Sequence, residues 1–136
     1  MKLYLIRHGQ TDSNLRKVFN SKTKDLNETG IKQAENLRKI IKDIDYEVIF
    51  SSTLLRAKHT AEIVNVNNKE IILDERLAER DPGNLQGKTL ETTDRDEYWN
   101  YYTQIQYGTS EKIIDLFKRV EDVLSDLKQK HYNKVL

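Results

Sequence analysis

The most constraining feature of the sequence is the stretch from Leu3 to Asn14, in which four apolar residues stop abruptly at Arg7-His8-Gly9 and run into a polar turn. A short apolar run beside a charged segment predicts a central parallel strand that is covered on both faces. In open α/β sheets, ligands bind beyond the carboxyl ends of such strands. We therefore expect Arg7 and His8 to emerge at a ligand site.

The residues after His8 favour an anionic ligand. Gly9 lets another group approach the backbone closely, and the polar residues from Thr11 to Asn14 can cap a short helix whose free N–H groups attract an anion. A guanidinium, an imidazole and backbone donors together predict a phosphate pocket that needs no metal. The same residues also suit a strand-end histidine bonded to its neighbours beside a surface arginine, so this stretch alone leaves both interpretations open.

Strand and helix patterns alternate along the rest of the chain. Helical spacing of apolar residues begins at Asn27, after Ser51-Ser52-Thr53 and from Ser110, whereas the runs 48–50 and 71–73 predict strands. This alternation predicts an α/β fold, a three-layer sandwich with a mostly parallel central sheet flanked by helices.

The chain end predicts an incomplete sheet. With 136 residues, a single proline and no linker composition, the sequence predicts one domain over residues 1–136. The apolar run Lys134-Val135-Leu136 begins a further strand without completing it. We therefore expect a domain that is truncated at its C-terminal end.

Composition excludes several classes of protein. The 23 basic and 22 acidic residues nearly cancel, so no global field favours nucleic acid, and no apolar stretch approaches membrane length. The absence of cysteine excludes disulfides and thiolate chemistry, and three scattered histidines offer no recognisable metal-ligand spacing. No export signal is present at the N-terminus, and the Lys-, Asn- and Ile-rich composition is typical of an AT-rich bacterium, so we expect a cytoplasmic, bacterial protein.

Two further residues are candidates for the site. Arg56 lies in the first turn of a helix that follows a strand, where a bound anion would offset its unfavourable position against the helix dipole; alternatively it is a surface arginine paired with Glu62. Glu79 lies in a turn-rich loop after the third strand and can act as a general acid if the site favours its protonated form, or can simply solvate the loop.

Two segments next to these candidates also leave alternatives open. The basic loop 16–24 either rims the pocket or is solvated. The aromatic cluster 98–102 suits core packing or a substrate platform.

Four blocks in this order resemble the histidine phosphatase superfamily, also called phosphoglycerate mutase-like. The blocks are Arg7-His8-Gly9-Gln10-Thr11 with Asn14; Leu26, Thr29-Gly30 and Gln33-Ala34; Ser51 to Ala57 with Thr60-Ala61; and Leu77-Ala78-Glu79 with Gly83 and Leu85-Gln86-Gly87. The match is weaker after residue 88, where Glu111 and Arg119-Val120 are similar to the family.

The resemblance implies a role for each matching residue. His8 would be the nucleophile that becomes phosphorylated, Arg7 and Arg56 would hold the phosphoryl oxygens, Asn14 would help to position them, and Glu79 would donate a proton to the leaving alcohol. No cofactor or metal is implied. The other expected contacts to substrate or phosphate are Gly9, Thr11 and Ser21, the last standing where the family usually has a glycine.

The family pocket also contains a second histidine on a later strand, and neither His59 nor His131 matches it. This absence agrees with a chain that lacks the C-terminal part of the domain. In the family the missing strand lies beside the first one, so we expect an exposed sheet edge and a homo-oligomer formed through it.

The expected function is hydrolysis of a phosphorylated small molecule through a phosphohistidine on His8. A mutase must also hold a second phosphate, and residues 88–112 carry three basic and five acidic side chains, which favours a phosphatase. The alternatives are phosphoglycerate mutase-type transfer and an inactive module that binds phosphate or protein. No nucleic acid or membrane partner is expected.

Overall fold

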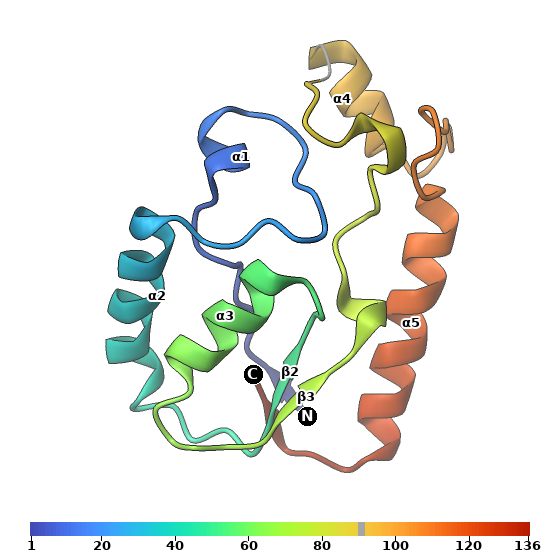
Figure 1. Ribbon diagram of the computed structural model, residues 1–136. Helices are drawn as coiled ribbons and strands as arrows, with labels where there is room; N and C mark the ends of the chain where they lie inside the picture. Colours follow the sequence, from blue (N-terminus) through green and yellow to red (C-terminus); the bar gives the residue numbers. More distant parts are fainter. Residues whose placement is uncertain (90–91) are drawn as a thin grey trace.

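A computed structural model of the protein describes residues 1–89 and 92–136 (Figure 1). The elements in chain order are β1 (Lys2–Leu3), α1 (Asp12–Leu15), α2 (Glu28–Ile41), β2 (Ile49–Ser51), α3 (Leu55–Val64), β3 (Ile71–Leu73), the 3₁₀ turns η1 (Glu75–Leu77) and η2 (Gly83–Leu85), α4 (Thr92–Tyr98), α5 (Ile113–Gln129) and β4 (Lys134–Val135). No helix in the described part of the chain is long and apolar enough to cross a membrane.

Two parallel strand pairs are joined into one sheet by β4. Strand β1 pairs with β4, and β2 pairs with β3. On its other side β4 contacts β2, because Val135 bridges Val48 and the Phe50 N–H donates to the Leu136 carbonyl at 2.8 Å. The strand order is therefore β1-β4-β2-β3, all parallel, with the two ends of the chain side by side.

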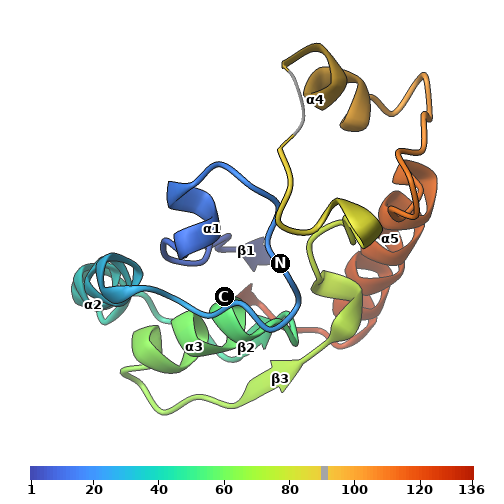
Figure 2. The ribbon, with the colours of Figure 1, turned by 45° about the horizontal axis from the view of Figure 1, so that its top comes forward.

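Helices cover both faces of this sheet, which confirms the expected three-layer α/β fold. Helices α2 and α3 lie on one side and α5 lies on the other (Figure 2). The core is correspondingly divided into two clusters. One contains Ile41, Tyr46, Ile49, Ala61, Val64 and Leu136, and the other contains Val48, Val123, Leu127 and Val135.

The expectation of a buried central strand over Leu3–Ile6 is wrong. Strand β1 ends at Leu3, and Leu5 is 91% exposed. Tyr4 and Ile6 pack against the core on the side of α2 and α3, so alternation turns Leu5 to the other face. Among the described residues β1 has no partner on its outer side, and it forms an edge of the sheet.

Helix α2 begins where the sequence predicts, whereas α3 begins later. Asn27 caps α2 by accepting a hydrogen bond from the Gly30 N–H at 2.9 Å. The predicted helix start at Ser51-Ser52-Thr53 is wrong by a few residues, because Ser51 belongs to β2 and the Ser52 hydroxyl accepts a bond from Leu54 N–H at 3.2 Å. Arg56 nonetheless lies in the first turn of α3.

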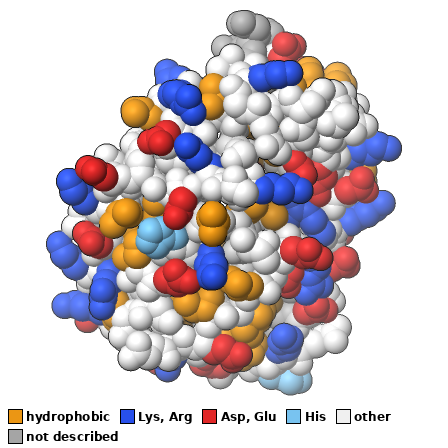
Figure 3. Space-filling view, in the orientation of Figure 1, with side chains coloured by type: hydrophobic (Ala, Val, Ile, Leu, Met, Phe, Trp, Pro, Cys, Tyr) orange, Lys and Arg blue, Asp and Glu red, His pale blue; other side chains and the backbone are white. Residues whose placement is uncertain are grey.

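Helix α5 differs from its prediction in two respects, its first residue and the share of its apolar stripe that is buried. It begins at Ile113 rather than at Ser110, since Glu111 bonds backbone to backbone with Asp81 in another loop. Only part of its apolar stripe is buried: Phe117, Val120 and Leu124 are 45%, 36% and 38% exposed. Elsewhere on the surface, charges of both signs are interspersed, as Figure 3 shows for one face.

Candidate active site

The turn after β1 is positioned by close contact between backbones. A side chain at Gly9 would overlap the carbonyl group of Gly30, and one at Gly30 would overlap the carbonyl of Gln10. Asn27 N–H also donates to the Gln10 carbonyl at 3.0 Å. The close approach that Gly9 allows is therefore to the start of α2, which fixes where the adjacent His8 lies.

The predicted polar cap after Gly9 forms helix α1. Thr11 accepts a hydrogen bond from the Asn14 N–H at 3.1 Å, and Asn14 Oδ1 accepts one from the Thr11 N–H at 3.0 Å. Thr11 is fully buried, so its side chain supports the turn. The Asn14 side chain keeps its NH₂ group as a donor for an anion.

His8 is held in one neutral tautomer. Its Nδ1 lies 2.7 Å from the carbonyl oxygen of Gly9, which can only accept, so Nδ1 carries the proton and Nε2 keeps its lone pair. Burial lowers the pKa of His8, and the charges of Arg56 and Arg7 lower it further, against the opposing effects of the Gly9 bond and Glu79. The imidazole is therefore neutral near pH 7.

Thr60 connects His8 to Arg56. The Gly9 N–H donates to Thr60 Oγ1 at 3.2 Å, and that hydroxyl donates to the Arg56 carbonyl at 2.7 Å. Thr60 is buried at the middle of α3. Sequence reasoning used Thr60 only as part of a motif; its presence in that motif was the one signal that could have indicated this role.

Arg56 is a buried cation, and one of its N–H donors has no partner among the described residues. It is 2% exposed, donates from Nη2 to Glu79 at 3.0 Å and from Nη1 to the Ser21 carbonyl at 3.0 Å. Its Nε is buried without a partner among the described residues. A buried unsatisfied donor costs about 1–3 kcal/mol, which a bound anion would offset.

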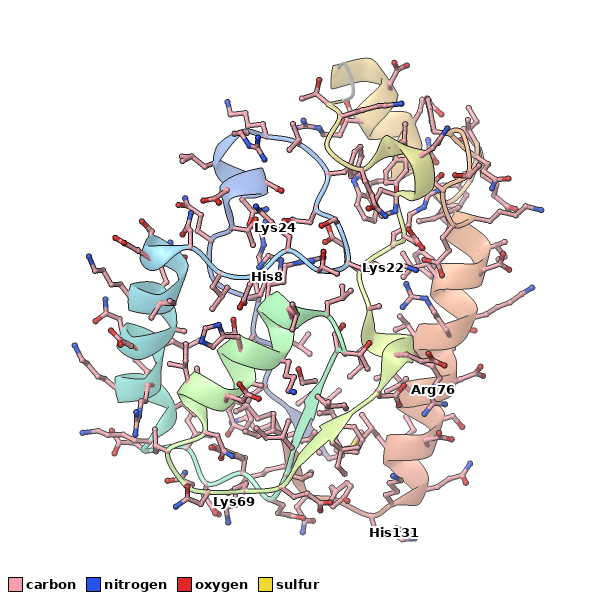
Figure 4. The ribbon with its side chains drawn as sticks, viewed as in Figure 1. His8, Lys22, Lys24, Lys69, Arg76 and His131 are labelled. Carbon is pink, nitrogen blue, oxygen red and sulfur yellow. The ribbon has the colours of Figure 1, made fainter. Side chains whose placement is uncertain are left out.

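The predicted charged residues come together around one cavity. His8, Arg7, Arg56 and Glu79 all line a cavity of about 450 Å³, whose remaining wall is largely apolar. Arg7 and Glu79 are exposed, whereas Arg56 is buried. Ser21 lies outside this set and lines a second cavity, of about 340 Å³, which shares Arg56 and Glu79 with the first. Figure 4 shows His8 close to the loop that carries Lys22 and Lys24.

A neutral histidine, an arginine and a carboxylate around one cavity are groups that can carry out phosphoryl transfer. The family model of the histidine phosphatase superfamily (branch 1) matches residues 3–136. The chain belongs to the histidine phosphatase superfamily.

Relatives named for different activities are similar to this chain. An uncharacterized phosphatase, PhoE, of Bacillus subtilis is 36% identical over 96% of this chain and 66% of its own length. A 2,3-bisphosphoglycerate-dependent phosphoglycerate mutase of Rhizobium rhizogenes is 41% identical over 62% of this chain and 44% of its own. The chain thus spans less than two thirds of the length of these relatives.

Solved structures of histidine phosphatases share the fold. The protein YhfR of Bacillus stearothermophilus has a TM-score of 0.83 and 29% identity, covering 98% of this chain and 70% of that one. The alpha-ribazole phosphatase from Shigella flexneri has a TM-score of 0.82 and 27% identity, covering 100% of this chain and 72% of that one.

The remaining sequence candidates lie apart from His8. His59 pairs with Asp25 at 3.1 Å, and no group of residues in ranges 1–89 and 92–136 is arranged to hold a metal ion. Of the aromatic cluster, Tyr98 is buried, and burial raises its pKa to about 12, so it stays a neutral phenol in the core. Tyr102, by contrast, is 92% exposed.

Proposed function

We propose that the protein hydrolyses phosphomonoesters of small molecules through a phosphohistidine at His8. The observation that carries the proposal is that a neutral His8, whose Nε2 keeps a lone pair, lines the same cavity as a buried Arg56 whose Nε has no partner among the described residues. A neutral imidazole is a nucleophile, and a guanidinium stabilises charge on phosphoryl oxygens without a metal. The phosphatase relatives support this reaction class.

The reaction has two displacements. His8 Nε2 forms a bond to phosphorus as the bond from phosphorus to the alcohol oxygen breaks, and Glu79 gives that oxygen a proton. Water then attacks the phosphohistidine, Glu79 takes the proton from the water, and the phosphorus–nitrogen bond breaks to release phosphate and neutral His8. Arg7 and Arg56 neutralise the equatorial oxygens, with Asn14 as a further donor.

Because Arg56 and Glu79 form an ion pair, a substrate that binds Arg56 also changes the contacts of Glu79. Phosphoryl oxygens compete with Glu79 for the Nη2 donor of Arg56, which now bonds it at 3.0 Å. Substrate binding therefore releases the Glu79 carboxyl from Arg56, so that it can turn toward the leaving oxygen.

The experiment that tests the proposal measures hydrolysis of p-nitrophenyl phosphate in EDTA. In parallel, the reaction is stopped rapidly without acid, so that a phosphoryl group on His8 survives for detection. We expect metal-independent turnover and an acid-labile, base-stable phosphoryl group on His8. Binding of phosphate with neither turnover nor label would instead identify an inactive phosphate-binding module. Transfer of the label to a phosphoglycerate acceptor in preference to water would identify mutase activity.

The domain organisation and setting are also proposals. We infer that the 136 residues form one histidine phosphatase-like domain whose catalytic set in the whole protein includes a second histidine outside them. Neither His59 nor His131 lines the cavity that contains His8, which supports this inference. A cytoplasmic, bacterial setting fits the bacterial relatives named above, and the near-neutral charge fits a protein without nucleic-acid or membrane partners.

We also propose that this chain self-associates through the outer edge of β1, next to which Leu5 is 91% exposed. Replacing Leu5 by lysine should convert concentration-dependent association into a monomer, because a charge beside an edge strand opposes pairing. Size-exclusion chromatography with light scattering measures the mass. Leu15→Lys is the matched control, since Leu15 is 66% exposed on α1, away from the edge. A parent chain that is monomeric at every concentration contradicts the proposal.

A further inference from the structure

Glu79 is anchored mainly through the residues on either side of it. Within residues 1–89 and 92–136, its side chain bonds only Arg56, at 3.0 Å, and its main chain forms no hydrogen bond. A phosphoryl group that takes the Arg56 donor therefore frees the Glu79 carboxyl. From that point the main chain of residues 76–81 determines where the carboxyl lies.

Arg119, on α5, holds the N-terminal side of this segment. Its Nη1 donates to the Arg76 carbonyl at 2.5 Å, and Figure 4 shows Arg76 beside α5. Its Nε and Nη2 donate to the two carboxylate oxygens of Glu111, at 2.7 and 2.8 Å. The side chains of Arg119 and Glu111 are only 19% and 17% exposed. Because two parallel hydrogen bonds fix the plane of the guanidinium, Arg119 has one orientation relative to Glu111.

Glu111 holds the C-terminal side of the same segment. Its Oε2 accepts a hydrogen bond from the Asp81 N–H at 3.1 Å, and its own N–H donates to the Asp81 carbonyl at 2.8 Å. Arg80, next to Glu79 in the chain, is 2% exposed and donates from Nε to the Glu111 carbonyl at 2.7 Å. The anchored residues on both sides of Glu79 therefore contact a single ion pair.

We propose that Glu111 and Arg119 are positioning residues for the general acid: they hold residues 76–81 so that the freed carboxyl of Glu79 faces the leaving oxygen. Neither residue takes part in the two displacements described above, and the inference rests on the proposed function. The two opposite charges neutralise each other, so the pair adds little to the attraction of a phosphate dianion. Its effect should therefore fall on protonation of the leaving group.

Two aryl phosphates separate protonation from phosphate binding. The p-nitrophenolate ion is weakly basic and leaves readily without a proton, whereas phenolate is more basic and depends more on the proton from Glu79. Phenyl phosphate and p-nitrophenyl phosphate share the ring and the phosphate. The value of kcat/KM reports formation of the phosphohistidine, so the ratio of the two values measures the general acid.

The test variant carries Arg119→Met together with Glu111→Gln, because removing both charges leaves neither of them unpaired in a mostly buried place. We expect kcat/KM for phenyl phosphate to fall roughly tenfold or more, and the value for p-nitrophenyl phosphate to stay within about twofold. Glu79→Gln should lower the value for phenyl phosphate further, on the order of a hundredfold. Adding the two substitutions to Glu79→Gln should cause no further loss, because the pair acts only through Glu79.

Asp126→Asn is the matched control on the same helix. It removes another ion pair between α5 and this segment, from Arg76 to Asp126 at 2.8 Å, and keeps the bond from Arg119 to the Arg76 carbonyl. The ratio of the two kcat/KM values should stay at the parental value. Thermal unfolding shows whether each variant is folded. If the double variant is not, Arg119→Lys provides the same comparison, since lysine keeps the charge and loses the parallel bonds.

The outcomes separate this proposal from the proposed function. An unchanged ratio, an equal loss for both substrates, or a further loss in the Glu79→Gln chain overturns the positioning role while the phosphate site stands. A loss of the same size in Asp126→Asn assigns the effect to attachment of α5 in general and also overturns it. A parental chain that hydrolyses neither substrate contradicts the proposed function itself.

Discussion

His8→Asn is expected to abolish hydrolysis of p-nitrophenyl phosphate, lowering kcat by on the order of 10⁴-fold or more. Asparagine is polar and of similar size, so it preserves the turn, but its amide nitrogen is not a nucleophile. Because the His8 side chain bonds only its neighbour Gly9 in the part of the chain that the structure describes, the melting temperature should change little. Steady-state kinetics and thermal unfolding measure the two effects.

His59→Asn is the matched control for this loss. The His59 ring also forms a hydrogen bond, in its case with the Asp25 carboxylate at 3.1 Å, but His59 does not line the cavity of His8. Its substitution should leave kcat unchanged. Residual turnover in His8→Asn at a tenth of the parental rate or more would contradict the phosphohistidine mechanism, because no covalent intermediate could then account for it.

Arg56→Lys should lower kcat/KM by roughly 10²- to 10³-fold. The lysine keeps the positive charge but loses the planar fork, so it cannot bond the Ser21 carbonyl, Glu79 and a phosphoryl oxygen at once. Affinity for inorganic phosphate should fall in parallel, because the same donors hold product and transition state. Kinetics and a phosphate titration provide the measurement.

The burial of Arg56 requires a control for folding. Arg38→Lys, on the exposed side of α2, tests the same chemical change where no ligand binds and should have no effect. Circular dichroism and thermal unfolding show whether Arg56→Lys keeps its fold. A folded Arg56→Lys chain with parental activity would show that the buried guanidinium does not hold the phosphoryl group.

The sequence predicted the layered fold because its apolar spacing reports which face of each helix is buried. Helix α2 and strand β3 lie where their patterns place them. Leu5 was misjudged because a short apolar run cannot show how many of its residues belong to a strand, and of Leu3–Ile6 only Leu3 lies in β1. The start of α3 was misjudged because Ser51 and Ser52 have the composition of a helix cap but complete a strand and a turn.

For the site, motifs indicated the chemistry but not the supporting contacts. His8, Arg56 and Glu79 were predicted by their positions after strands, and the structure brings them to one cavity. The connection through Thr60 and the burial of Arg80 depend on contacts between segments far apart in sequence, such as Arg80 with Glu111. No local spacing encodes such a contact. The partly exposed stripe on α5 likewise depends on what packs against it.

The placement of β4 has a consequence for the order in which the molecule folds. Among the described residues, strands β1 and β2 are connected only through β4, and the pairing of Lys2 with Lys134 closes a loop of about 130 residues. Helices α2 and α3 and the pair β2 and β3 consist of contacts within a much shorter segment, so they can assemble early, whereas β1 docks later. During synthesis the outer strand β1 therefore gains its partner only after residues 134–135 have left the ribosome, whereas the turn at Gly9 can be held earlier by its contacts with Gly30 and Thr60.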